Sequence, residues 1–226
     1  MNEPTAPRSD PPAQPRDAAT VVVLRDGGDG VEVYLVKRSR MVDFMAGAHV
    51  FPGGRFDPAD ASLEACAVRE TFEEAGLQLD PAALVPWVRW VTPDISPRRF
   101  DARFFLARSP AGQEPRVDGR EATEGLWIAP ARALERWLGD DMLLAPATAK
   151  CLDALLAHRR VDEALAAAAK RPPPVMQPLV WNDKERGRAY ISLPGDPRHA
   201  VREDLLGGTI LRLQLEEGRY RPVKAD

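Results

Sequence analysis

The alternation of apolar and polar positions predicts a β-hairpin near the start of the chain. An apolar, β-branched run at residues 20–24 is followed by turn residues at 26–30 and by an alternating segment at 31–36. Similar short runs predict strands at 84–91, 103–107 and 126–128, with a loop at 92–99. We therefore expect the fold to begin at Ala18 with strands that build a sheet.

Other segments have the composition of helices. Residues 63–76 are rich in Ala, Leu, Glu and Arg, and Gly76 is placed to end that helix. A short helix is predicted at 130–138, and one or two at 147–170 before the prolines at 172–174. Strand-like pieces return at 189–193, 209–215 and 219–223. Because helices interleave with frequent hairpins, the pattern favours an α+β fold with a mixed sheet between helices.

The 226 residues suit one domain with an appendage, or two small domains. Residues 1–17 are proline-rich and polar, which predicts a disordered tail. We expect a main domain at 18–145 and, at 146–226, an extension of helices and strands packed on it. The alternatives for this extension are a cap over a site and the surface of a homodimer.

Composition restricts the function classes. A net charge of -3 gives no general attraction to nucleic acid or to anionic membranes. No run approaches the roughly 20 apolar residues of a membrane span, and residues 1–17 lack the apolar segment of a signal peptide. Cys66 and Cys151 are far apart, a pattern suited to a reducing compartment. We expect a cytoplasmic protein that binds neither nucleic acid nor membrane.

The helix at 63–76 carries the candidate chemistry. On a helical wheel Arg69, Glu70, Glu73 and Glu74 share one face, while Val68 and Phe72 fall on the opposite one. Carboxylates crowded into one turn repel one another, and a hard cation such as Mg²⁺ or Mn²⁺ relieves that repulsion. The alternative is a solvated acidic face, which is the commoner meaning of a Glu-Glu pair.

The surrounding residues decide between these alternatives. Gly53-Gly54 and Arg69-Glu70-Thr71-Phe72-Glu73-Glu74-Ala75-Gly76-Leu77 resemble the Nudix box, G-x5-E-x7-R-E-U-x-E-E-x-G-U, where U is a bulky aliphatic residue. The front half departs from it, because one residue is inserted and Asp60 stands where the box has a structural glutamate. The resemblance covers about residues 18–140 and implies a Nudix-type α/β/α sandwich.

The same resemblance implies roles for individual residues. Glu70, Glu73, Glu74 and the carbonyl of Gly53 would bind Mg²⁺ or Mn²⁺, and Arg69 would orient the acids. A further catalytic glutamate would precede a late strand, where Glu121 and Glu124 are the candidates and Glu124 lies nearer the strand. The implied reaction is hydrolysis of a diphosphate bond in a small nucleoside diphosphate derivative, with the identity of the general base left open.

The segments at 35–54 and 90–105 are similar to the coenzyme A diphosphatase branch of that family, including its peroxisomal type. The implied substrate is coenzyme A or an acyl-CoA. Arg38, Arg98 and Arg99 are then candidates to bind its phosphates, and Phe51 to stack on its adenine, against the alternatives of surface arginines and core packing. Nucleotide sugars or dinucleotides as substrates, and a non-catalytic nucleotide-binding module, are the rival hypotheses.

Overall fold

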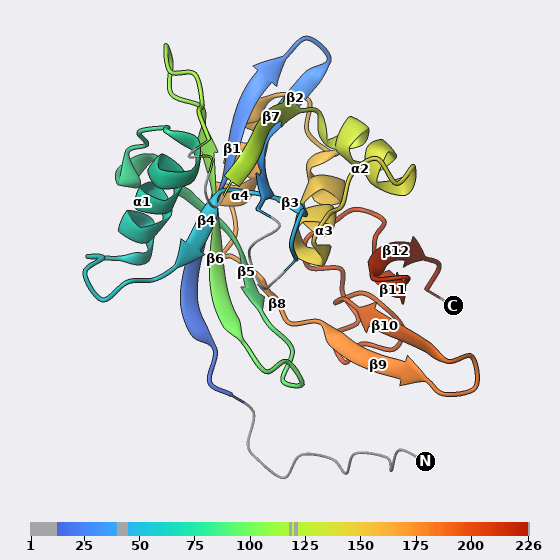
Figure 1. The fold of residues 1–226 in the computed structure, drawn as a ribbon. Coiled ribbons are helices and arrows are strands. Elements are labelled where there is room, and N and C mark those ends of the chain that lie inside the picture. Colours follow the sequence, from blue (N-terminus) through green and yellow to red (C-terminus); the bar gives the residue numbers. More distant parts are fainter. Residues whose placement is uncertain (1–12, 40–44, 118, 120–121, 226) are drawn as a thin grey trace.

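The computed structural model describes residues 13–39, 45–117, 119 and 122–225. Its main sheet runs in the order β3-β2-β1-β6-β5-β8, with β4 paired to β1 and β7 paired to β2 (Figure 1). The strands are β1 Arg16–Gly27, β2 Gly30–Arg38, β3 His49–Val50, β4 Gly53–Arg55, β5 Val85–Val91, β6 Phe100–Arg108, β7 Ala122–Ile128 and β8 Val175–Met176. The pairs β1–β6 and β5–β8 are parallel and the others antiparallel, so the predicted mixed sheet is confirmed.

Helices cover both faces of this sheet. Helix α1 (Leu63–Ala75) lies on one face, and α2 (Pro130–Leu138), α3 (Pro146–Leu155) and α4 (Val161–Ala169) lie on the other, while Pro81–Ala83 form a short 3-10 helix, η1 (Figure 1). Alternate side chains of a strand point to opposite faces. Val21 and Val23 therefore pack on the α1 side, and Val22 and Leu24 pack on the side of α2, α3 and α4.

Local sequence rules account for the hairpin and for α1. The β1–β2 hairpin forms at the predicted turn, with Gly27 opposite Gly30. The Ser62 side chain accepts a hydrogen bond from the Ala65 amide at 3.2 Å and caps α1. Gly76 ends the helix with a left-handed φ of 67°, a conformation that glycine adopts without steric cost. The ordered fold begins before the predicted Ala18, because Arg16 and Asp17 belong to β1 and pair with β6.

Burial on α1 does not follow the two faces of the helical wheel. Phe72 on the apolar face is 50% exposed, whereas Thr71 and Glu74 are buried. Small residues, Cys66, Ala67 and Ala75, make the contact with the sheet instead. A small-residue contact brings the helix axis close to the sheet, and the box carboxylates then reach the strand backbone.

Residues 146–226 pack on the preceding part through a shared core. Besides α3, α4 and β8 they form a second sheet in the order β12-β11-β10-β9, made of β9 Leu179–Asp183, β10 Arg188–Ser192, β11 Arg212–Glu216 and β12 Arg219–Val223. The fully buried Lys150 of α3 forms an ion pair with Asp204 at 3.2 Å. Asp153 of α3 accepts hydrogen bonds from the amides of Thr209 and Ile210 at 2.6 and 2.7 Å.

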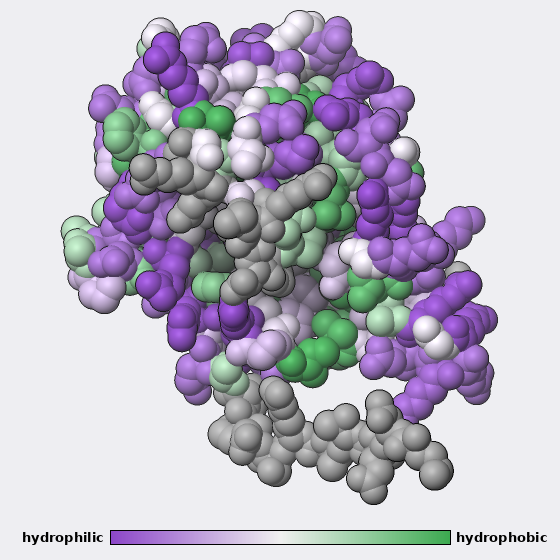
Figure 2. Space-filling view, in the orientation of Figure 1, coloured by the Kyte–Doolittle hydropathy of each residue, from purple (hydrophilic) through white to green (hydrophobic). Residues whose placement is uncertain are grey.

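One face of the molecule shows how hydrophilic and apolar side chains are distributed over its surface. Hydrophilic side chains dominate the rim of the molecule, and apolar ones gather in the middle of the view, toward the seam with the second sheet (Figure 2). Within the part of the chain that the structure describes, every helix is too short or too polar to cross a bilayer.

Candidate functional site

The site lies where the sheet forks. Along one edge of β1, Ala18, Ala19 and Thr20 pair with β4, whereas residues 24–27 of the same strand pair with β2. The other edge of β1 is covered by β6 over residues 16–24. Two arms therefore leave β1 on the same side: β4, which packs under α1, and β2, which carries β3 and β7.

Glycines bring α1 against the β4 arm. A Cβ atom at Gly54 would lie 2.4 Å from the carboxyl carbon of Glu70, and one at Gly53 would lie 2.5 Å from the carbonyl oxygen of Ala19. The Gly53 amide donates a hydrogen bond to Glu74 Oε2 at 3.0 Å. The structure thus brings Gly53 and Gly54 together with Glu70 and Glu74, because no glycine side chain separates the backbone from the acids. The metal-binding roles of these residues stay predictions.

Arg69 organises the remaining charges. Its Nε and Nη2 donate to the two carboxylate oxygens of Asp60 at 2.8 and 2.9 Å, and its Nη1 donates to Glu70 at 2.8 Å and to Glu73 at 3.0 Å. These hydrogen bonds hold the pKa of Asp60 far below its ordinary value, despite the opposing effect of burial, and raise the pKa of Arg69. The inserted residue and the shorter acid at position 60 therefore still deliver a carboxylate to Arg69.

Burial differs among the three box acids. Glu74 is 6% exposed and the Glu70 side chain 13%, whereas the Glu73 side chain is 56% exposed. Within the described ranges, no three His, Cys, Asp or Glu side chains are gathered as a metal-binding cluster. The donor chemistry of these residues nevertheless fits a hard divalent ion, which takes carboxylate and carbonyl oxygens as ligands.

Glu124 lies on the other arm of the fork. On β7 it is opposite Lys37 of β2, and its Oε2 accepts from Lys37 Nζ at 3.3 Å. Among the described residues, the ion pair of Glu124 is the one with Lys37, and α1 contributes no partner to it. Glu121, the other candidate for the further catalytic glutamate, lies outside the described residues.

The four predicted substrate-binding residues are dispersed. Phe51 is 3% exposed and packs edge-to-face on Phe104, with ring centroids 6.5 Å apart. Arg99 is 8% exposed and donates to the carbonyl oxygens of Thr92 and Ala13 at 3.1 and 2.8 Å. These contacts are those of core and loop-fixing residues, so the substrate roles of Phe51 and Arg99 stay predictions.

The two other arginines lie at separate places. Arg98 is exposed and lines, with Arg16 and Arg99, a pocket of about 340 Å³ at the start of β1. Arg38 ends β2 opposite Ala122 and is half-buried. Their phosphate-binding roles also stay predictions.

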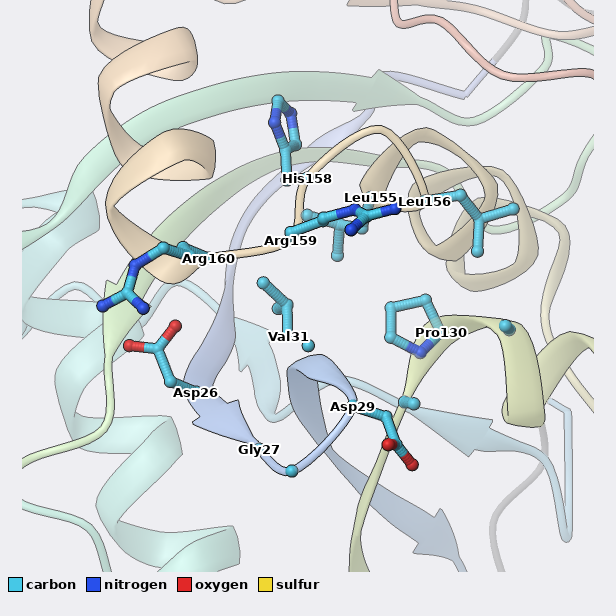
Figure 3. A pocket seen from close by; sticks show the side chains of 14 residues that line it. Asp26, Gly27, Asp29, Val31, Pro130, Leu155, Leu156, His158, Arg159 and Arg160 are labelled. Carbon is cyan, nitrogen blue, oxygen red and sulfur yellow. The ribbon is translucent and has the colours of Figure 1, made fainter.

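A pocket of about 670 Å³ lies elsewhere, between the β1–β2 turn, the start of α2 and the α3–α4 loop (Figure 3). Val31, Pro130 and Leu155 line its interior, and Arg160 lies beside Asp26 (Figure 3). None of its lining residues belongs to α1 or β4. The pocket is therefore not the place of the box chemistry.

The geometry predicts different consequences for the two box glycines. Gly54→Ala is expected to lower kcat about tenfold, because its methyl group displaces the flexible end of Glu70 and with it the placement of the reacting groups. Gly53→Ala meets rigid backbone and is expected to cost about 1–3 kcal/mol of stability. Kinetics and thermal unfolding of both variants test this, and loss of folding in Gly54→Ala with retained folding in Gly53→Ala would contradict it.

A mixed sheet between helices, with a carboxylate-bearing helix held against a glycine pair, defines the class of this protein. The NUDIX domain model matches residues 14–146, and the chain belongs to that family. A NUDIX hydrolase from Alicyclobacillus acidocaldarius has a similar structure, with a TM-score of 0.62 and 28% identity over 68% of this chain and 96% of that one.

Two curated relatives are named by a specific activity. Peroxisomal coenzyme A diphosphatase 1 of Saccharomyces cerevisiae is 40% identical over 70 residues, which is 30% of this chain and 21% of the relative. The acyl-coenzyme A diphosphatase NUDT19 of Xenopus laevis is 23% identical over 216 residues, 51% of this chain and 57% of the relative. The chain thus spans between about a fifth and three fifths of their lengths.

Proposed function

We propose that this protein is a metal-dependent diphosphatase that hydrolyses coenzyme A or acyl-CoA to 3′,5′-ADP and (acyl-)4′-phosphopantetheine. The observation that carries the proposal is the cluster in which Arg69 binds Asp60, Glu70 and Glu73 while Gly53 binds Glu74. An acidic face that was merely solvated would not bury Glu74 and leave the Glu70 side chain only 13% exposed beside the glycine pair.

In this proposal Glu70, Glu73, Glu74 and the Gly53 carbonyl hold Mg²⁺ or Mn²⁺. When bound, such an ion neutralises diphosphate oxygens and acidifies water. Arg69 keeps Glu70 in place through a charge-assisted hydrogen bond of 2.8 Å. A water oxygen attacks one phosphorus, its proton passes to a carboxylate, and the bridging oxygen leaves with the other phosphate. We take Glu124 as the proton acceptor, with Glu70 and Glu73 as the alternatives.

The choice of coenzyme A is supported by the two curated relatives, which are named as diphosphatases of coenzyme A and acyl-coenzyme A, and by the similarity of segments 35–54 and 90–105 to that branch. Nucleotide sugars and dinucleotides contain the same diphosphate, so the box itself does not discriminate among them. Both cysteines are free and buried, which fits the proposed reducing, cytoplasmic location. A homodimer formed through residues 146–226 stays a prediction.

A side-by-side assay tests the substrate. The purified chain with Mg²⁺ or Mn²⁺ is incubated with coenzyme A, an acyl-CoA, ADP-ribose, NADH and diadenosine polyphosphates, and products are separated chromatographically. We expect kcat/KM to be highest for a coenzyme A derivative, with 3′,5′-ADP as a product. Preference for ADP-ribose or NADH would overturn the substrate, and ligand-induced thermal stabilisation without any product would favour the non-catalytic module.

A further inference from the structure

Lys37 occupies the centre of a row of polar side chains across the β2 arm. In the antiparallel registers it lies opposite Glu124 on one side and opposite His49 on the other. Residues paired in this way share a face of the sheet, with Cβ atoms about 4.5–5.5 Å apart. Leu35, two residues earlier on the same face, packs in the core shared with α3, so Lys37 is the point at which this face of β2 turns polar.

A β-bulge sits at this place. The register between β2 and β7 shifts between Lys37 and Arg38, so that Thr123 is the extra residue on β7. The Thr123 hydroxyl donates to the Lys37 carbonyl oxygen at 3.4 Å and holds the bulge to β2. Bulges redirect neighbouring side chains and are common beside active sites. Here the residue that follows the bulge on β7 is Glu124.

The third member of the row, His49, lies on the strand that leads into the glycine pair. His49 is 4% exposed, and its amide donates to the Leu143 carbonyl oxygen at 2.7 Å. β3 begins at His49 and leads through Phe51 and Pro52 directly into Gly53. Lys37 is therefore paired at once with the strand that bears Glu124 and with the strand that enters the glycine pair.

The charges in the row favour one partner for the ammonium ion. Burial lowers the pKa of His49, the carboxylate of Glu124 opposes that shift, and the positive charges of Lys37 and of Arg136 on α2 add to it. A neutral imidazole offers Lys37 no counter-charge. Among the described residues, the ion pair formed by Lys37 is the one with Glu124 at 3.3 Å.

We propose that Lys37 is a positioning residue that holds Glu124 in the geometry needed for proton transfer in diphosphate hydrolysis. This inference rests on the proposed function and assigns a role outside the box. The pair is about half-exposed, with side-chain exposures of 36% and 52%, and such pairs contribute little to stability. Stabilisation of the fold therefore does not explain well why the Lys37–Glu124 pair lies at a β-bulge within a row of polar side chains.

The test is a double-mutant cycle with Lys37→Met, Glu124→Gln and the double variant, assayed on the best substrate. Lys37→Met keeps the apolar stem and removes the charge, and we expect it to lower kcat about 10- to 100-fold with KM changed less than about twofold. If Lys37 acts through Glu124, the double variant equals Glu124→Gln. Lys37→Arg retains the charge and should recover most of kcat.

Arg25→Met is the matched control, because Arg25 forms a cross-strand ion pair with Glu32 at 2.7 Å in the same sheet. It should leave kcat unchanged. Three results would each overturn the inference, provided that Glu73→Gln shows its expected loss of turnover. They are wild-type kcat in Lys37→Met, wild-type kcat in Glu124→Gln, and multiplicative losses in the double variant. Inactivity of the wild-type chain on every diphosphate, or full activity of Glu73→Gln, would instead overturn the proposed function and the inference together.

Discussion

Replacing Glu73 by Gln is expected to lower kcat about 100- to 1000-fold, the scale of losing one charged group that stabilises a transition state. Glu73 is the exposed box acid and forms an ion pair with Arg69 at 3.0 Å. Arg69 keeps Asp60 and Glu70 when this contact weakens, so the fold should survive the substitution. Steady-state kinetics at several metal concentrations, with calorimetric titration of Mg²⁺ or Mn²⁺, measures both the loss of turnover and the weaker metal binding.

Glu64→Gln provides the control on the same helix. Glu64 lies in the first turn of α1, outside the box acids, and its substitution removes the same charge. It should leave kcat within about twofold of wild type, as expected of a residue that makes no contact with reacting groups. Equal turnover of Glu73→Gln and wild type would refute the metal site.

Asp60→Asn is expected to lower both stability and activity. It removes the carboxylate that accepts two hydrogen bonds from Arg69, and losing hydrogen bonds to a charged group that is 32% exposed costs about 2–3 kcal/mol. Without Asp60, Arg69 is expected to hold Glu70 less firmly, and kcat should fall about tenfold through the looser geometry. Urea unfolding and kinetics measure the two effects.

The same variant carries a pH signature. Hydrogen bonds from Arg69 depress the pKa of Asp60 below its ordinary value of 3.8. A depressed carboxyl pKa contributes stability that is fully present above the unfolded value and is lost as the pH falls through the folded value. Wild type should therefore lose stability as the pH falls below about 4, and Asp60→Asn should lose less over the same interval. Asp29→Asn, an exposed turn residue, should follow wild type; parallel curves for wild type and Asp60→Asn would contradict the anchoring role.

Elements whose interactions lie close together in the sequence could be predicted from it. The β1–β2 hairpin and the end of α1 at Gly76 follow from turn and capping chemistry, which acts between residues close in sequence. Helix α2 also formed within its predicted bounds. The short strands β3 and β4 carry too few residues for any periodicity, so the fork that they create was not predictable.

Side-chain roles illustrate the same limit. Phe51 and Arg99 have the chemistry of adenine and phosphate ligands, yet Phe104 and the carbonyl oxygen of Ala13 occupy their contact surfaces in the fold. Lys37 gave no signal of its own, because the register of β7 against β2 decides that Glu124 lies beside it. Register depends on pairing between residues 87 positions apart, which no local pattern encodes.

The sequence by itself determined the acidic helix, its glycine pair and the family to which they belong, because a box of charges spaced on one helix is read directly from the chain. Tertiary structure decided where each member of the box lies and which groups it contacts. It left Phe72 half-exposed, buried Glu74, placed Glu70 against Gly54, and paired Arg69 with Asp60. The reason is physical: burial and charge pairing depend on which distant backbone approaches the helix, and only the folded sheet settles that approach.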